Sequence, residues 1–254
     1  MASVLWQELT AEELRARAAA DAIVILPVGS MEQHGPHLPT GVDTILCGAV
    51  CKAAAERVGG EAVVVAPTVW CGMAEHHMAF GGTFTLDIPT YRAVLLALLK
   101  SFERQGFHRV VIVNGHGGNI AALNAFLPDF ARETSLRVLA VSYPDFAKRT
   151  VAALLQDQPG MLHACEVETS MMMAVAPDLV RTDRLSEAHD GETAETRRQG
   201  RRTIARYRSF KEKCPGGVWG DARRATGEKG EAIVEAIVVA MALRLADRDA
   251  EIWH

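Results

Sequence analysis

The stretch "AIVILPVGSMEQHGPHLPTGVDTILCGAVCKAAAERVGG", residues 22–60, indicates the fold class of this chain. It opens with the apolar run "AIVILPVG", which lacks polar alternation and is typical of a strand buried on both faces of a parallel sheet. A polar loop follows, and then a helical segment that ends at a glycine pair, a common helix stop. Strand, loop and helix in this order predict an α/β protein.

Three further apolar runs have the same character and predict three more strands, at 62–70, 109–115 and 137–143. Helical patterns alternate with them, at 90–106, 119–133, 166–175 and 228–247, and Pro128 is expected to kink or restart the helix that contains it. The order predicts a doubly wound or layered α/β sheet. Residues 187–221 are the least regular part, interpreted as an insertion or an oligomer contact.

Composition narrows the class of protein. The chain has 254 residues, 49% hydrophobic and 23% charged, which is typical of a soluble globular protein, and we expect a single domain over 1–254. A net charge of −4 does not favour nucleic acid or membrane partners, and the basic cluster at 195–213 is interpreted as a solvated helix face. The five cysteines form no CxxC pair, and Cys47 and Cys51 share one helical face, which suggests buried, reduced thiols in a cytoplasmic protein. No signal peptide or membrane span is expected.

Polar side chains follow two of the predicted strands at the points where the strands end. Glu32, His34 and Asp43 come after the first strand, and His116 follows the third in "NGHGGN". Ligands of open α/β sheets bind outside the carboxyl ends of the strands, so these side chains are expected to meet. Carboxylate and imidazole together suit Zn, Mn, Fe or Ni. On spacing alone, Asp43 is equally well explained as a helix N-cap.

A third polar cluster is "HACEVETS", which contains His163, Glu166 and Glu168. On a regular helix His163 and Glu166 share a face, whereas Glu168 lies about 140° away from His163. Both His163 and Glu168 can therefore face one site only if His163 precedes the regular helix. The three clusters contain no Lys or Arg to neutralise the acids, and buried carboxylates without cationic partners need metal ions or protons.

Four motifs, "PVGSMEQHGPHLPTGVD", "NGHGGN", "HACEVETS" and "GVWGDARRATGEKG", resemble the creatininase family of amidohydrolases, in order and over essentially the whole chain. The resemblance implies a three-layer α/β fold with a mainly parallel sheet and helices on both faces. It also implies two divalent metal ions per subunit (Zn, Mn or Fe), a small-molecule amide substrate and a homo-oligomer, with a hexamer favoured.

The same resemblance assigns roles to individual residues. Glu32 and His116 would hold one metal ion, His34 the other, and Asp43 would bridge the two. His163 and Glu168 match the catalytic pair of the family. A family metal ligand is replaced here by Gly118, and Glu166 is the predicted substitute. Substrate contacts are predicted on other grounds. His77 follows the second strand and so reaches the same edge, and the main-chain N–H groups of Gly117 and Gly118 lie at a helix start, where they suit a substrate oxygen.

The predicted reaction is hydrolysis of a C–N bond in an amide or cyclic amide by water that two metal ions activate. Creatininase itself has tryptophans that flank its substrate, and the matching positions here are Pro144 and Pro159, which argues against creatinine. The alternatives are a formamide deformylase or peptide-trimming hydrolase with the same centre, and a non-catalytic metal-binding homologue. A nucleotide-binding protein is disfavoured because no GxGxxG opens a helix after the first strand.

Overall fold

The computed structural model describes residues 3–156, 158–191 and 206–247. Its sheet contains four parallel strands in the order β2-β1-β3-β4. Their bounds are β1 Ile23–Val28, β2 Val63–Val65, β3 Arg109–Asn114 and β4 Arg137–Ser142. All four predicted strands are present, but the second is shorter than its apolar run, and Val69 rejoins the sheet only through an isolated bridge to Val28.

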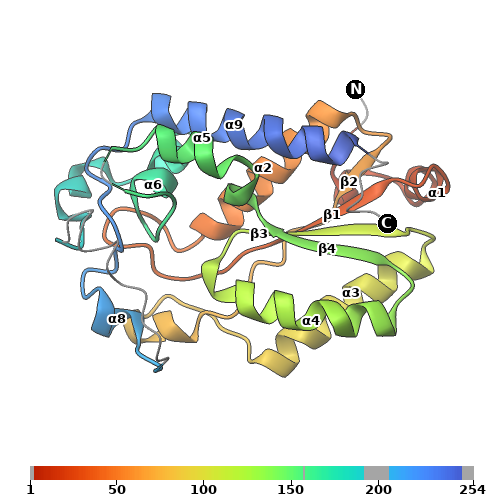
Figure 1. The fold of residues 1–254 in the computed structure, drawn as a ribbon, viewed down its shortest axis with the longest axis horizontal. Helices are drawn as coiled ribbons and strands as arrows, with labels where there is room; N and C mark the ends of the chain where they lie inside the picture. Colours follow the sequence, from red (N-terminus) through yellow and green to blue (C-terminus); the bar gives the residue numbers. More distant parts are fainter. Residues whose placement is uncertain (1–2, 157, 192–205, 248–254) are drawn as a thin grey trace.

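Helices cover both faces of this sheet and make a three-layer α/β structure (Figure 1). One face carries α2 Val42–Val58, α5 Lys148–Ala153, α6 Glu166–Val175 and α9 Gly227–Ala246. The other carries α3 Ile88–Arg104 and α4 Ile120–Glu133. The remaining short elements are α1 Ala11–Ala19, α8 Phe210–Lys213, η1 Trp6–Glu8, η2 Glu75–Phe80, η3 Gly117–Asn119, η4 Tyr143–Ala147, η5 Pro177–Leu179 and η6 Thr182–Glu187.

The side chains of β1 show why its sequence lacks polar alternation. Ile23 and Ile25 belong to the apolar core that contains residues of α2 and α9, whereas Val24 and Leu26 belong to the core on the α3 and α4 side. Successive side chains of a strand point to opposite faces, so a strand that separates two cores is apolar at every position. The predicted α/β class with a parallel sheet is confirmed.

The helix boundaries follow local signals. Helix α2 ends at Gly59, whose φ of 106° is in the region that favours glycine. Helix α3 begins where the Asp87 side chain accepts a hydrogen bond from the Thr90 N–H, with Pro89 in its first turn. Pro128 does not restart α4, which runs through it, and the proline lies on the exposed side of the helix.

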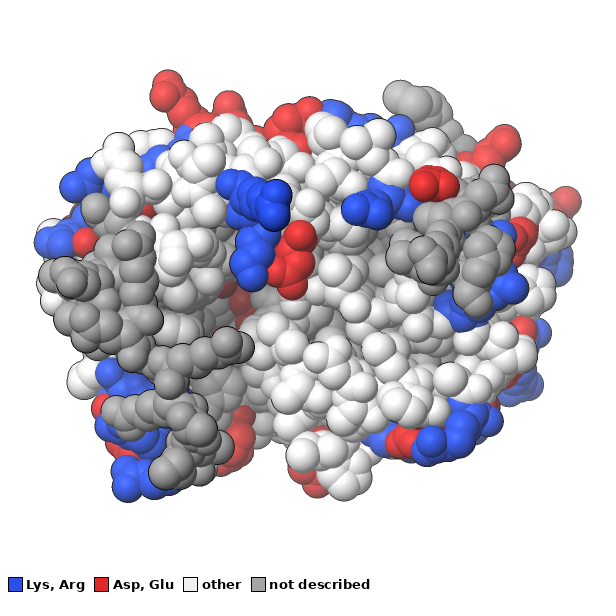
Figure 2. Space-filling model, viewed as in Figure 1, with Lys and Arg blue, Asp and Glu red and all other residues white. Residues whose placement is uncertain are grey.

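Part of the segment predicted to be irregular, residues 192–205, lies outside the described residues, and with it most of the basic cluster at 195–213. The described part of that cluster, 206–213, contains α8. Cys47 and Cys51 are both fully buried free thiols, as predicted. In the described ranges, no helix has the length and apolarity needed to span a membrane. On the face shown in Figure 2, acidic and basic side chains are mixed around the margin, without a broad patch of one sign.

Candidate metal centre

The loop after β1 delivers Glu32 and His34 to the carboxyl end of the sheet, where both side chains are buried. The Ser30 hydroxyl donates a hydrogen bond to Glu32 Oε2 at 2.8 Å. His34 Nδ1 lies 3.1 Å from the main-chain oxygen of Glu32 and donates to it, so Nε2 is the ring nitrogen that faces the cluster. Contacts of this kind orient side chains as metal ligands before any ion binds.

Asp43 lies in the first turn of α2, one residue inside the helix, because the N-cap is Gly41. The N-cap interpretation of Asp43 is therefore wrong. Its Oδ1 lies 3.2 Å from His34 Nε2, and its Oδ2 lies 3.0 Å from His116 Nδ1. The helix N-terminus also favours a negative charge at this position. Asp43 thus stands between two imidazoles that come from different loops.

The loop after β3 brings His116 to Asp43 because a glycine allows the two chains to approach. A Cβ at Gly115 would lie 2.8 Å from the main-chain oxygen of Asp43 and 2.8 Å from the Cβ of Cys47, so any larger residue would push the loop away from α2. Asn114 shapes the same loop: its Oδ1 accepts from the His116 N–H, and its Nδ2 donates to the His116 carbonyl.

Asn119, the last residue of "NGHGGN", connects three loops at this edge. Its Nδ2 donates to the Gly29 carbonyl at 3.1 Å, and its Oδ1 accepts from the Met73 N–H at 2.9 Å. Neither asparagine of the motif was predicted to have a role at the site, although both are polar residues within a glycine-rich strand-end loop.

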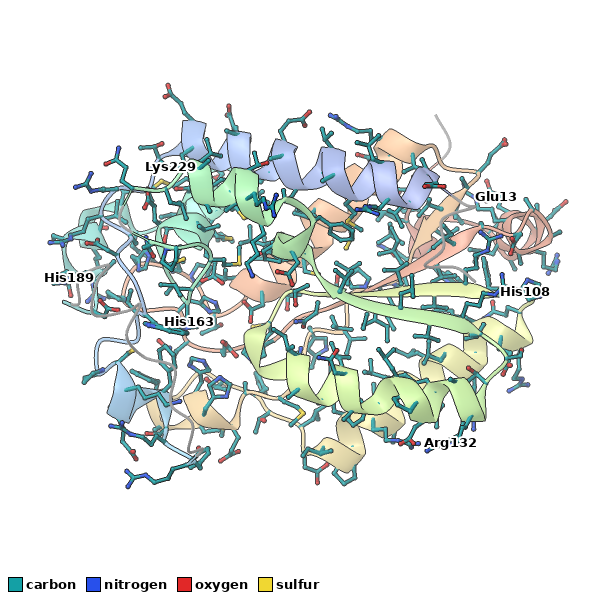
Figure 3. The ribbon with its side chains drawn as sticks, viewed as in Figure 1. Glu13, His108, Arg132, His163, His189 and Lys229 are labelled. Atoms are coloured by element: carbon teal, nitrogen blue, oxygen red, sulfur yellow. The ribbon has the colours of Figure 1, made fainter. Side chains whose placement is uncertain are left out.

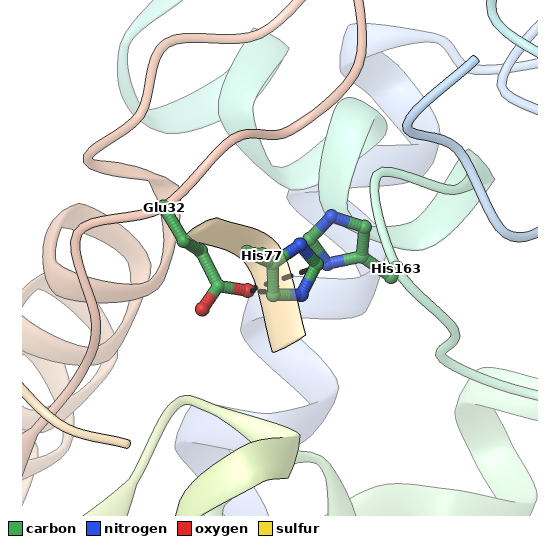
Figure 4. A group of neighbouring side chains, drawn as sticks. All are labelled: Glu32, His77 and His163. Carbon is green, nitrogen blue, oxygen red and sulfur yellow. Dashed lines mark ion pairs between the residues drawn. The ribbon is translucent and has the colours of Figure 1, made fainter. Parts of the chain in front are cut away.

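Glu32, His77 and His163 form a compact group (Figure 4). Glu32 Oε1 lies 3.2 Å from His77 Nε2 and 3.6 Å from His163 Nδ1. Gln33 Nε2 lies 2.9 Å from His77 Nδ1 and 2.9 Å from His163 Nε2. Gln33 was not predicted as a site residue, and the only signal in the sequence is its place between Glu32 and His34. His77, expected as a substrate contact, lies within the cluster.

Glu168 reaches the same site from α6, and its Oε2 lies 4.0 Å from His34 Nε2. Because α6 begins at Glu166, His163 precedes the regular helix, which was the condition for His163 and Glu168 to share one site. Between them, Ala164 adopts a φ of 51°, and its N–H donates to Glu168 Oε2. A non-glycine residue in this region costs about 1 kcal/mol or more, and such strain is found near functional sites.

Glu166, the predicted replacement ligand, does not join the cluster. It is 1% exposed, its Oε1 is paired with Lys229 Nζ of α9, and its Oε2 accepts from Gln158 Nε2 at 3.2 Å. Residues two apart on a helix point to roughly opposite sides, so Glu166 faces α9 when Glu168 faces the cluster. Lys229 and His163 lie at the same end of the molecule, on different elements (Figure 3).

Gly118 leaves no room for the ligand that the family carries at its position. A Cβ there would lie 2.3 Å from His116 Nε2 and 2.5 Å from the Met73 carbonyl oxygen. Gly118 instead lines a pocket of about 250 Å³ next to His116, whereas Gly117 is exposed, with open space where its Cβ would lie.

The pKa values of the clustered side chains show that the buried carboxylates are stabilised by positive charge. Burial lowers the pKa of His34, but Asp43, Glu168 and Glu32 outweigh burial and raise that pKa to about 9. Burial also lowers the pKa of His116, but Glu32 and Asp43 outweigh burial and raise that pKa well above its ordinary value. Burial raises the pKa of Glu168 to about 7, although His34 opposes the shift. Without cations, the carboxylates thus retain protons on the neighbouring imidazoles.

Three further histidines at the site, His76, His77 and His163, stay neutral. Burial, together with the positive charge of protonated His34, holds the pKa of His163 well below its ordinary value. Burial and His76 lower the pKa of His77 to about 2. Burial, His116 and Lys213 lower that of His76 to about 4. Neutral imidazole is the form that binds metal ions.

The donor set fits metal ions. Three of its buried atoms, Glu32 Oε1, His34 Nε2 and Asp43 Oδ2, have no hydrogen-bond partner, although each lies near an oppositely polarised group. Polar atoms that lie close together without hydrogen-bond geometry are expected where a cation would lie between them. Three overlapping triads have ligand atoms within 4.8 Å of one another: Glu32–His34–Asp43, His34–His163–Glu168 and Glu32–His77–His163. Carboxylate and imidazole donors suit Zn, Mn or Fe.

Comparison with known proteins gives one consistent result. A family model, Creatininase (creatinine amidohydrolase), matches residues 7–245. The chain is 32% identical over 262 residues to the creatinine amidohydrolase of Pseudomonas putida, covering 94% of this chain and 95% of that protein. It is also 32% identical over 233 residues to a mycofactocin precursor peptide peptidase of Mycobacterium ulcerans (strain Agy99), covering 88% and 84%.

Solved structures agree. A crystal structure of creatinine amidohydrolase superposes with a TM-score of 0.82 at 30% identity, covering 97% of this chain and 98% of that one. A mutant creatininase of Zn-Zn type and a creatininase with Mn give TM-scores of 0.79 and 0.75 at 31% and 32% identity, each covering 98% of both chains. These relatives therefore have metal-bound forms on the same fold.

Proposed function

The chain belongs to the creatininase family and is a metal-dependent hydrolase, and from this premise we propose that it hydrolyses a C–N bond of an amide or cyclic amide. The observation that carries the proposal is the buried cluster in which Asp43 stands between His34 and His116, with three ligand atoms that have no hydrogen-bond partner. A linear amide would give a carboxylate and an amine or ammonia, and a cyclic amide would give one ring-opened molecule that carries both groups.

We propose two metal ions per subunit. Glu32, Asp43 and His116 would hold one ion, and His34, Asp43 and Glu168 the other, so that Asp43 is shared. This assignment gives Glu168 the place that a glutamate at Gly118 would fill in creatininase, and the 4.0 Å between Glu168 Oε2 and His34 Nε2 supports it. When bound, such ions lower the pKa of water and polarise the substrate carbonyl.

His163 is the residue of this chain best suited to move a proton. In the tautomer that donates from Nε2 to the Gln33 carbonyl oxygen at 2.9 Å, its Nδ1 faces Glu32 Oε1 and is free to take up a proton. This nitrogen can accept the proton of the attacking water and pass it to the leaving nitrogen. Gln33 fixes the ring, and the N–H groups near Gly117 and Gly118 are proposed contacts for the substrate oxygen.

The test combines elemental analysis with turnover of an amide panel. We expect about two metal ions per wild-type chain. Asp43→Ala should lose both metal and activity, whereas His163→Ala should retain metal and lose turnover. Wild-type protein that binds no Zn, Mn or Fe when these are supplied would overturn the proposal. Full turnover by His163→Ala would remove only the role of His163.

A second candidate is peptide trimming by the same centre. It is favoured by the identity to the peptide peptidase, which equals the identity to the creatinine amidohydrolase, and by Pro144 and Pro159, where creatininase carries tryptophans. Short peptides in the panel, scored by amine release, separate the two candidates. A homo-oligomer (with a hexamer favoured), a cytoplasmic location and a single domain over 1–254 remain predictions.

A further inference from the structure

The pocket beside the metal centre has two different walls. One wall comes from the strand-end loops and includes Met73, His76 and Gly118. The His76 ring stacks on His116, with 5.6 Å between ring centroids and 15° between planes. The pocket therefore adjoins the proposed metal ligand His116. The other wall comes from residues 206–213, the segment that ends with α8.

Phe210 attaches this second wall to the cluster itself. Its buried ring lies 4.5 Å from the ring of His77 and 4.8 Å from that of His163, measured between centroids. Tyr207 adds a hydrogen bond from its hydroxyl to the Glu75 carbonyl at 3.4 Å. The side chains of this segment are thus held at a defined place relative to the proposed reacting centre.

The pocket is lined mainly by cations, whereas the neighbouring cluster contains several carboxylates. Three cations line it, Arg206, Arg208 and Lys213, against one carboxylate, Glu75. Within the described ranges, neither Arg206 nor Lys213 forms an ion pair, and the carboxylate nearest Arg208 is that of Glu212, 4.0 Å away. Arg208 Nε is buried without a hydrogen-bond partner. The chain has a net charge of −4, so three cations around one pocket depart from the overall charge. A pocket of this kind favours an anionic ligand.

We propose that the substrate carries a carboxylate, which the cations of residues 206–213 bind while its C–N bond faces the metal centre. This inference rests on the proposed function and narrows it to anionic amides. Guanidinium and ammonium groups bind carboxylates through charge-assisted hydrogen bonds, and a neutral amide of the same shape gains none of them. The reaction adds water to the amide carbonyl and breaks the C–N bond, so that the carbonyl becomes a carboxylate and the nitrogen leaves as a protonated amine or ammonia. The carboxylate that the substrate already carries is unchanged.

The test uses succinamate and succinamide, two amides of nearly equal size that differ in one charge. Their dissociation constants are measured by calorimetry on metal-loaded protein, and ammonia release is measured in parallel. We expect succinamate to bind roughly tenfold more tightly, since these cations are partly exposed and their hydrogen bonds are weaker than buried ones. In the Arg206→Gln/Lys213→Gln variant the preference should fall to within about twofold, with unchanged metal content.

The control is Lys211→Gln, which removes one charge from the same short helix outside the pocket and should keep the preference. Any of three results would overturn the inference: equal binding of the two amides, no measurable succinamate binding, or a preference that survives in the double variant.

Hydrolysis is scored separately. A charge preference without ammonia release from any amide would refute the proposed function alone, whereas equal binding with turnover of both amides would refute the anionic-substrate inference alone.

Discussion

The pair formed by Glu166 and Lys229 provides the sharpest test of the site as the structure shows it. The Glu166 side chain is 1% exposed and that of Lys229 is 19% exposed. Lys229 Nζ also donates to the Arg224 carbonyl at 3.0 Å, and Gln158 donates to the second oxygen of Glu166. This pair joins α9 to the start of α6, which carries Glu168 into the cluster.

Lys229→Met leaves a buried carboxylate with Gln158 as its remaining partner. Breaking a buried ion pair by removing one member costs about 3–5 kcal/mol, and the partial exposure of Lys229 places the expected loss near 3 kcal/mol. Glu166→Gln should cost less, about 1–2 kcal/mol, because the lysine left behind can reach water. The double variant removes both charges and should lie within about 1 kcal/mol of wild type.

Equilibrium unfolding in urea, with metal present at saturation, measures these free energies. The matched control is Lys52→Met, which removes an exposed lysine 3.8 Å from Glu56 and should change stability by less than about 0.5 kcal/mol. Elemental analysis gives the second readout: Glu166→Gln should keep the metal content of wild type, whereas Glu168→Gln should lower it. A Glu166→Gln protein of unchanged stability that had lost one metal ion would refute the reasoning and restore Glu166 as a ligand.

Three further predictions concern other parts of the molecule. Gly118→Ala should lower metal content because its Cβ would lie 2.3 Å from His116 Nε2, whereas Gly117→Ala, with open space around its Cβ, should keep the metal content of wild type. Equal losses of metal in both variants would argue against this packing. Asp87→Ala removes the N-cap of α3 and should cost about 1 kcal/mol in urea unfolding with turnover unchanged, and an unaffected midpoint would contradict the cap. Removal of metal by a chelator should lower the unfolding temperature, and Zn or Mn should restore it, because ligands that bind only the folded state stabilise it; an unfolding temperature indifferent to chelator would argue against the metal centre.

The fold could be read from local patterns because each pattern has a local physical cause. Apolar runs such as 22–29 and 109–115 are strands because a strand between two helical layers has no solvent face. The glycine pair at 59–60 stops α2 because Gly59 takes a positive φ. The apolar run at 62–70 predicted the strand less well, because β2 contains only three of its residues. The length of a paired strand also depends on where the neighbouring chain segments turn.

The convergence of Glu32, His34, Asp43 and His116 was predictable from chain order, because the carboxyl ends of parallel strands share one edge. The choice between Glu166 and Glu168 was not. Both are acidic residues in the first turn of one helix, and the rotation of α6 between the cluster and Lys229 of α9 decides which of them faces the site. That rotation results from packing between segments far apart in the chain, and no local pattern records it.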